Sequence, residues 1–180
     1  MNQNILIDQL LDFYSKLNEV FSVVNKNYPD IQCKTGCNRC CKFYGSPELY
    51  QLEWQNIQNH IESKFTNKEI KRIERKFLQG LLNDEDNKNE ESVTECPFIY
   101  KNMCSIYENR PFVCRVFGLS KFQNKLMTCS EELNRWENND STLIPNKEKL
   151  EIELLNILKN ENKEIKTINQ WLNKYFKNDQ

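Results

Sequence analysis

Apolar side chains recur at helical spacing along most of the chain. In residues 5–25, 50–64 and 70–81 they stand three or four positions apart, and the same spacing returns twice within residues 147–177. This spacing gathers apolar side chains on one face of a helix. The pattern therefore predicts a mainly α fold in which each helix buries one face.

Polar and turn-forming residues indicate where the helices begin and end. Ser46-Pro47-Glu48 has the composition of a helix N-terminus, and Thr66-Asn67-Lys68-Glu69 has that of a capping box. Residues 83–92 hold no apolar side chain and predict a solvated loop. Short apolar runs on both sides of Lys101-Asn102 indicate a small β-hairpin. Short helical pieces are also expected at residues 108–114 and 133–136.

Charge and hydropathy exclude several classes of partner. The 180 residues carry a net charge of -1, so there is no positive field to hold nucleic acid. No apolar run approaches the ~18 residues of a membrane-spanning helix. Asp8 and Asp12 interrupt the N-terminal apolar face, unlike a secretory leader. We therefore expect one domain, residues 1–180, in the cytoplasm and without a membrane partner.

Eight cysteines are the main chemical feature of the chain. Thiols stay reduced in the cytoplasm, which favours metal binding over disulfides. Thiolates are soft donors that suit zinc and iron. The spacing Cys37-x2-Cys40 lets a tight turn aim two sulfurs at one ion, and Gly36 permits the positive φ of such a turn. The candidate metal ligands are Cys33, Cys37, Cys40, Cys41, Cys96, Cys104, Cys114 and Cys129.

The adjacent pair Cys40 and Cys41 constrains how the thiols are shared. Neighbouring side chains diverge in helices and strands, so we expect these two to face different partners. Eight thiols divide most simply into two four-sulfur sites, or one cluster and a second site. A single four-cysteine site with four bystanders is the alternative, and the sequence leaves both open. The region 30–130 is expected to need its metal to fold, because structural zinc contributes ~10–16 kcal/mol in small peptides.

Other residues give weaker signals. Cations beside the cysteines either offset thiolate charge or are ordinary surface charges. His60, the single histidine, is expected at the surface of a helix, and the alternative is a ligand of a Cys3His site. No catalytic or cofactor-binding residue is predicted, and no glycine-rich phosphate loop is present. The cations are Lys34, Arg39, Lys42, Arg110 and Arg115.

Three motifs occur in order within residues 30–130. They are Gly36-Cys37-x2-Cys40-Cys41, Cys96-Pro97-Phe98, and Cys104-Ser105-Ile106-Tyr107-Glu108-x-Arg110-Pro111-x2-Cys114-Arg115. In this order they resemble a bacterial cysteine-cluster family of zinc- or iron-chelating domains (YkgJ-like, CxxCxxCC). The resemblance implies metal binding through the eight cysteines, with Arg110, Pro111 and Arg115 as supporting residues. The spacing Cys33-x3-Cys37 is one residue longer than in the family's label.

The prediction is a protein that binds zinc or iron through up to eight Cys thiolates. Its irregular cysteine-rich core would lie between an N-terminal helix, 5–25, and C-terminal helices within 147–177. Two alternatives stay open. The family grouping includes a flagellin lysine methylase, which keeps open a methyl-transfer or iron–sulfur enzyme that modifies protein side chains. Crowded thiols beside cations also suit a thiol redox or metal-release sensor. No protein partner is predicted.

Overall fold

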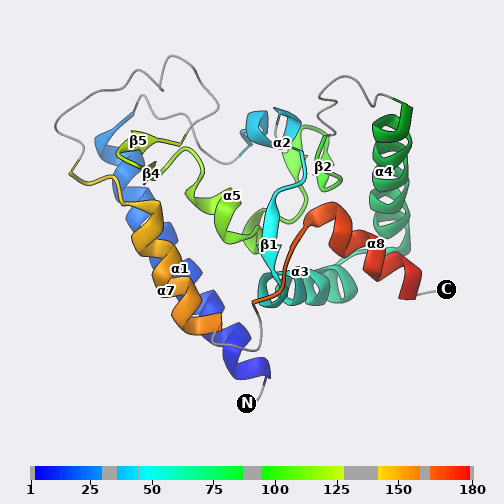
Figure 1. The fold of residues 1–180 in the computed structure, drawn as a ribbon, viewed down its shortest axis with the longest axis horizontal. Helices are drawn as coiled ribbons and strands as arrows, with labels where there is room; N and C mark the ends of the chain where they lie inside the picture. Colours follow the sequence, from blue (N-terminus) through cyan, green and yellow to red (C-terminus); the bar gives the residue numbers. More distant parts are fainter. Residues whose placement is uncertain are drawn as a thin grey trace. The chain divides into compact units, whose positions relative to one another are not determined.

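The described residues form helices and three short antiparallel strand pairs (Figure 1). The computed structural model describes residues 3–29, 36–43, 45–86, 95–127, 142–158 and 163–178. The chain divides into two compact units. The first is Met1–Thr35 with Pro111–Lys163, and the second is Gly36–Arg110 with Glu164–Gln180. The prediction of a mainly α fold with a small hairpin is confirmed.

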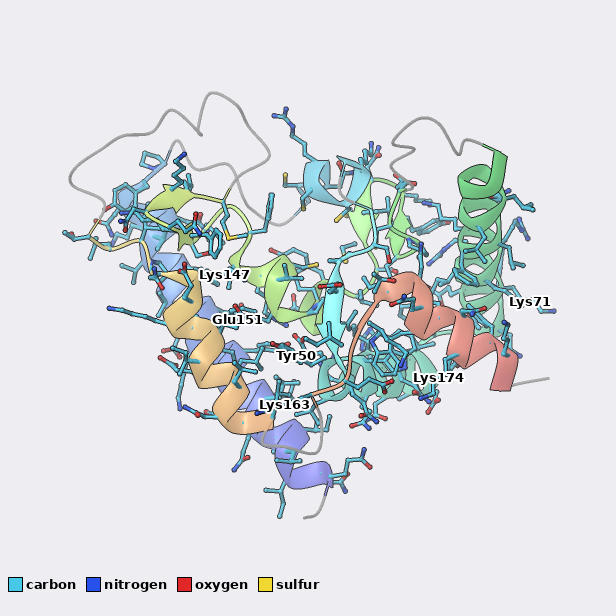
Figure 2. All side chains as sticks on the ribbon, viewed as in Figure 1. Tyr50, Lys71, Lys147, Glu151, Lys163 and Lys174 are labelled. Carbon is cyan, nitrogen blue, oxygen red and sulfur yellow. The ribbon has the colours of Figure 1, made fainter. Side chains whose placement is uncertain are left out.

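The first unit is organised by two long helices. Its elements are α1 (Gln3–Asn27), α5 (Phe112–Val116), β4 (Lys121–Phe122), β5 (Lys125–Leu126) and α7 (Lys147–Leu158). α7 packs along α1, as Figure 1 shows. α5 joins α1 through stacked rings, since the centroids of Phe13 and Phe112 are 6.2 Å apart. α7 carries a partly buried i,i+4 ion pair, Lys147 with Glu151, at 3.0 Å (Figure 2).

The predicted helix at residues 5–25 is confirmed as α1, and its buried face follows the helical period. Leu11 also fits the spacing of three or four, yet it is 42% exposed. The apolar stripe is therefore narrower than the sequence suggests. The buried side chains of α1 are Leu6, Leu10, Phe13, Tyr14, Leu17, Phe21 and Val24.

The second unit holds most of the described cysteines and the remaining elements. These are α2 (Arg39–Phe43), β1 (Glu48–Tyr50), α3 (Gln51–Lys64), α4 (Asn67–Asp86), β2 (Ile99–Tyr100), β3 (Met103–Cys104), η1 (Tyr107–Asn109), β6 (Ile165–Thr167) and α8 (Ile168–Asn178). β1 and β6 pair antiparallel with Leu49 opposite Lys166, although they lie near opposite ends of the unit's sequence. This pairing fixes where α3 and α8 begin, because each helix follows directly after one of the two strands.

The expected helix start at residues 46–48 is wrong. Glu48 is in β1, and α3 begins only at Gln51. The Tyr50 N–H donates to the Glu53 carboxylate at 2.9 Å, which caps α3. Ser46 does act as a helix cap, but for a different helix, since its Oγ accepts from the Asn169 N–H of α8 at 2.7 Å. Ser46 is therefore a helix cap, as its local sequence indicates. The pairing of β1 with β6 places it at the start of α8 instead of α3.

Of the other predicted boundaries, one is confirmed and two are wrong. The capping box at residues 66–69 is confirmed, because the Thr66 N–H donates to the Glu69 carboxylate at 2.8 Å. The loop expected at residues 83–92 is wrong for its first part, since α4 continues to Asp86. Residues 108–114 do not form one helical turn, because Pro111 separates η1 from α5. The helix expected at 133–136 lies outside the described residues.

A core of aromatic and branched side chains holds the second unit together. The rings of Trp54 and Trp171 stack with centroids 6.0 Å apart and planes at 7°. The Trp171 indole N–H donates to the Leu49 carbonyl at 3.3 Å, so α8 is fixed to both α3 and β1. The buried members are Leu49, Trp54, Ile57, Ile61, Ile73, Phe77, Cys96, Phe98, Ile99, Ile106, Ile168, Trp171 and Leu172.

Candidate metal centre

The short helix α2 presents two of the candidate ligands. Gly36 has a φ of +91°, which turns the chain just before Cys37 and so bears out the expectation for this glycine. The Cys40 and Cys41 sulfurs lie 3.9 Å apart. The expectation that these neighbouring side chains diverge is therefore wrong. Rotation about the Cα–Cβ bonds of Cys40 and Cys41 brings their sulfurs toward each other on α2. Residue spacing alone does not reveal this rotation.

The β2–β3 hairpin brings two more cysteines to the same region. Cys104 pairs with Ile99 across the hairpin, whose turn is made by Lys101 and Asn102 with φ of 48° and 62°. Cys96 precedes the hairpin and is 6% exposed. Its N–H donates to the Cys41 carbonyl at 2.9 Å, so the backbone joins this segment directly to α2.

Four thiols thus converge in the second unit. Cys96 belongs to the apolar core, and Cys41 and Cys104 pack against that core. Cys40 lies close enough to Cys96 and Cys104 to raise the pKa of both thiols. We call Cys40, Cys41, Cys96 and Cys104 the cysteine cluster.

Three thiols of the cluster, those of Cys40, Cys96 and Cys104, have raised pKa values. Hydrogen bonding to Cys41, followed by burial, holds the pKa of Cys40 well above its ordinary value. Burial raises the pKa of Cys96 to about 12 and also raises the pKa of Cys104. Desolvation disfavours the thiolate, so a bound cation would have to displace protons from these sulfurs.

The four sulfurs of the cluster are suitable donors for a soft metal ion, and the separation of two of them also fits such an ion. Two sulfurs on a tetrahedral ion with bonds of ~2.3 Å stand about 3.8 Å apart. The Cys40–Cys41 separation of 3.9 Å is close to this value. Among the described residues, however, no three or more His, Cys, Asp or Glu side chains are already grouped at metal-binding distances.

The other predicted ligands are placed differently. Cys37 is half-buried just before α2. Cys114 is half-buried on α5 and belongs to the first unit, whereas the cysteine cluster belongs to the second. Cys33 and Cys129 lie outside the described residues. His60 is half-buried on α3 against the ring of Phe65, with centroids 5.4 Å apart.

The predicted supporting residues have definite packing roles. Arg110 lies over the Tyr107 ring at 3.8 Å, and its charge opposes the rise in the pKa of Cys104. Pro111 is the N-cap of α5. Arg115 is 2% exposed, and it lies over the Tyr14 ring at 4.0 Å. Arg115 is therefore a buried contact between α5 and α1 and not a surface charge.

Lys76 is a residue near the cluster that the sequence did not indicate. From α4 its ammonium group donates to the Ile99 carbonyl at 2.8 Å and to the Glu95 carboxylate at 2.6 Å. Its positive charge opposes the burial that raises the pKa of Cys96. No local motif marks this lysine, because its partners lie about twenty positions further along the chain.

Lys76→Met is expected to lower the free energy of unfolding by about 1 kcal/mol. The charged donor would be lost from a carbonyl of the core, but the Lys76 and Glu95 side chains are 30% and 39% exposed, so screening limits the effect. Urea unfolding of the purified protein measures it. Lys71→Met on the exposed side of α4 (Figure 2) is the control and should stay within about 0.5 kcal/mol of the wild type. Equal losses in the two variants would contradict the role of Lys76.

A separate hollow lies between α3 and α8. Its volume is about 170 Å³, and no cysteine lines it. Lys174, labelled in Figure 2, stands at its edge. The hollow is therefore distinct from the cysteine cluster. Its lining residues are Gln51, Trp54, Gln55, Gln58, Glu62, Trp171, Lys174 and Tyr175.

Comparison with known proteins identifies the cysteine-rich region. Residues 32–142, more than half of the chain, match the family model CxxCxxCC, whose description reads "Putative zinc- or iron-chelating domain". The chain belongs to the CxxCxxCC family. The match confirms the resemblance carried by the three cysteine motifs. No curated protein and no solved structure matches the chain.

The family match accounts for the cysteines of both units but not for the whole fold. The CxxCxxCC region ends at residue 142, whereas the core around Cys96 also contains Ile168, Trp171 and Leu172 of α8. Within the described parts of the chain, no helix is long and apolar enough to cross a membrane.

Proposed function

We propose that this CxxCxxCC protein binds zinc or iron through thiolates, with Cys40, Cys41, Cys96 and Cys104 as the ligands of one ion. The observation that carries the proposal is the convergence of two cysteine-bearing segments, joined by the hydrogen bond from the Cys96 N–H to the Cys41 carbonyl. The other predicted ligands, Cys33, Cys37, Cys114 and Cys129, are not assigned to an ion.

The chemistry of the cluster supports a structural role for the metal. A bound cation would stabilise thiolates that burial otherwise keeps protonated. It would also tie α2 to the hairpin and the core at once. The proposal requires reduced thiols and therefore a reducing compartment such as the cytoplasm.

Cys104→Ser is expected to remove about one equivalent of metal from protein purified without oxygen. Serine keeps the size of the side chain but is a poor ligand for a soft ion. Elemental analysis for zinc and iron gives the stoichiometry. Met103→Ser is the control, because this neighbouring sulfur is a thioether and is 57% exposed; it should keep the full metal content. Wild-type protein without zinc or iron, or full metal content in Cys104→Ser, would contradict the proposal.

The optical spectrum of the same preparation distinguishes a mononuclear ion from a cluster. A colourless protein with full zinc supports the proposed structural site. A brown protein with broad visible absorption would indicate an iron–sulfur cluster and would favour an enzyme that modifies protein side chains.

The 3.9 Å contact between Cys40 and Cys41 favours a second candidate function, a thiol redox or metal-release sensor. Hydrogen peroxide would take two electrons and two protons from a pair of cluster thiols, forming one disulfide and two molecules of water. The lost thiolates would no longer hold the ion. Loss of two thiols together with metal release would support this function, and unchanged thiol and metal content after peroxide would exclude it.

A further inference from the structure

We infer that Asn102 is a positioning residue that holds the hairpin of Cys104 against the helix of Cys40 and Cys41. This inference rests on the proposed function, because it concerns how the cysteine cluster is assembled. Asn102 stands in the turn between β2 and β3, two positions before Cys104. It is not a candidate ligand itself.

Two side chains from the α2 segment reach Asn102. The Asn38 amide donates to the Asn102 carbonyl at 2.7 Å. The Lys42 ammonium group donates to Oδ1 of Asn102 at 3.0 Å. Asn38 and Lys42 lie one helical turn apart and on either side of Cys40 and Cys41, so one turn residue is bound from both ends of the cysteine helix.

The backbone of the hairpin explains why an asparagine stands at the turn. Lys101 and Asn102 have φ of 48° and 62°, the left-handed conformation of a two-residue hairpin turn. Asparagine tolerates this conformation better than most residues with a Cβ. Unlike glycine, it also offers a side-chain oxygen, and that oxygen is the acceptor for Lys42.

The hydrogen bonds from Asn38 and Lys42 to Asn102 are expected to raise the metal affinity of the cysteine cluster. The two halves of the cysteine cluster come from segments about sixty residues apart in sequence, and the contacts to Asn102 add to the Cys96–Cys41 backbone hydrogen bond that joins them. A contact that orients the halves beforehand reduces the ordering cost of binding. Contacts that orient metal ligands in this way typically change metal affinity ~10- to 100-fold. The lower end applies here, because Lys42 and Asn102 are exposed.

The chain offers a matched control for Asn102→Gly. In the β4–β5 hairpin, Gln123 and Asn124 have φ of 49° and 61°, nearly the same turn as Lys101 and Asn102. Asn124→Gly therefore makes the same backbone change in a hairpin that has no cysteine on its strands. Any general effect of glycine in such a turn appears in both variants.

The first experiment measures zinc affinity by competition with a chromophoric chelator under anoxic conditions. Asn102→Gly is expected to bind zinc about tenfold more weakly than the wild type, and Asn124→Gly is expected to be unchanged. In a Lys42→Met background, Asn102→Gly is expected to have a much smaller effect, because the bond from Lys42 is already lost and only the 3.5 Å contact from the Asn38 amide to Oδ1 of Asn102 remains. An Asn102→Gly affinity equal to that of Asn124→Gly, or an undiminished tenfold effect without Lys42, would overturn the inference.

The second experiment uses metal-free, reduced protein and hydrogen exchange. The Lys42 N–H donates to the Asn38 carbonyl at 3.1 Å within the α2 segment. Asn102→Gly is expected to speed the exchange of this amide several-fold, while Asn124→Gly leaves it unchanged. If wild-type protein bound no metal, the proposed function would fail, and this comparison would still decide whether Asn102 holds α2.

Discussion

Removing the metal with a chelator under anoxic conditions is expected to loosen the attachment of α2 to the second unit. The free energy of unfolding of that unit is expected to fall by several kcal/mol. Structural zinc contributes ~10–16 kcal/mol in small peptides. That value is an upper limit here, because Phe98 and Ile99 of the hairpin stay anchored in the apolar core. α2 has only five residues, too few to persist alone, and without metal it is held by the contact of Cys41 with the core, the backbone bond from Cys96 and the bonds to Asn102.

Hydrogen exchange with and without chelator is the measurement. The amides of α2 should lose much of their protection but not all of it, while those in the middle of α3 should keep most of theirs. Protein in which all thiols have been alkylated serves as the metal-free reference. If α2 kept its protection in the chelator, metal would not organise this region, and the expectation that residues 30–130 need metal to fold would be wrong.

Trp171→Ala is expected to destabilise the protein by about 3–5 kcal/mol, the usual cost of removing a large buried ring. Trp171 is 2% exposed, stacks on Trp54 at 6.0 Å and donates to the Leu49 carbonyl. Such a loss is a large part of the ~5–15 kcal/mol that typically stabilises a domain.

Urea unfolding followed by circular dichroism tests this prediction. Trp171→Phe keeps an aromatic ring but loses the indole donor, so it should cost less than the alanine variant. Ile165→Ala is the neighbouring control, because Ile165 is 49% exposed on β6, and it should change stability by less than about 1 kcal/mol. A Trp171→Ala protein as stable as the Ile165→Ala protein would show that α8 contributes little to the core.

Features whose interacting residues lie close together in the sequence could be predicted. The helical spacing of apolar residues gave α1 to within two residues at either end, and the Thr66–Glu69 capping box gave the start of α4. The turn at Lys101 and Asn102 was indicated by two flanking apolar runs. In each case the interacting groups lie within a few positions, so local composition determines the structure.

Features that depend on distant partners could not be predicted. The strand β1 has three residues and no periodic signal of its own, and it exists because β6 pairs with it. Lys76 and Asn102 likewise act on partners far along the chain. The Cys40–Cys41 contact could not be predicted for another reason, since residue spacing does not determine the side-chain rotation that brings the two sulfurs to 3.9 Å.

The pairing of β1 with β6 also bears on how the protein matures during translation. The ribosome releases the cysteine-bearing segments well before residues 165–178, yet these later residues supply the strand partner and the tryptophan that close the core beside Cys96. A nascent chain would therefore expose its thiols in an unfinished structure until residues 165–178 have emerged. Stable loading with metal is thus expected to follow the docking of α8.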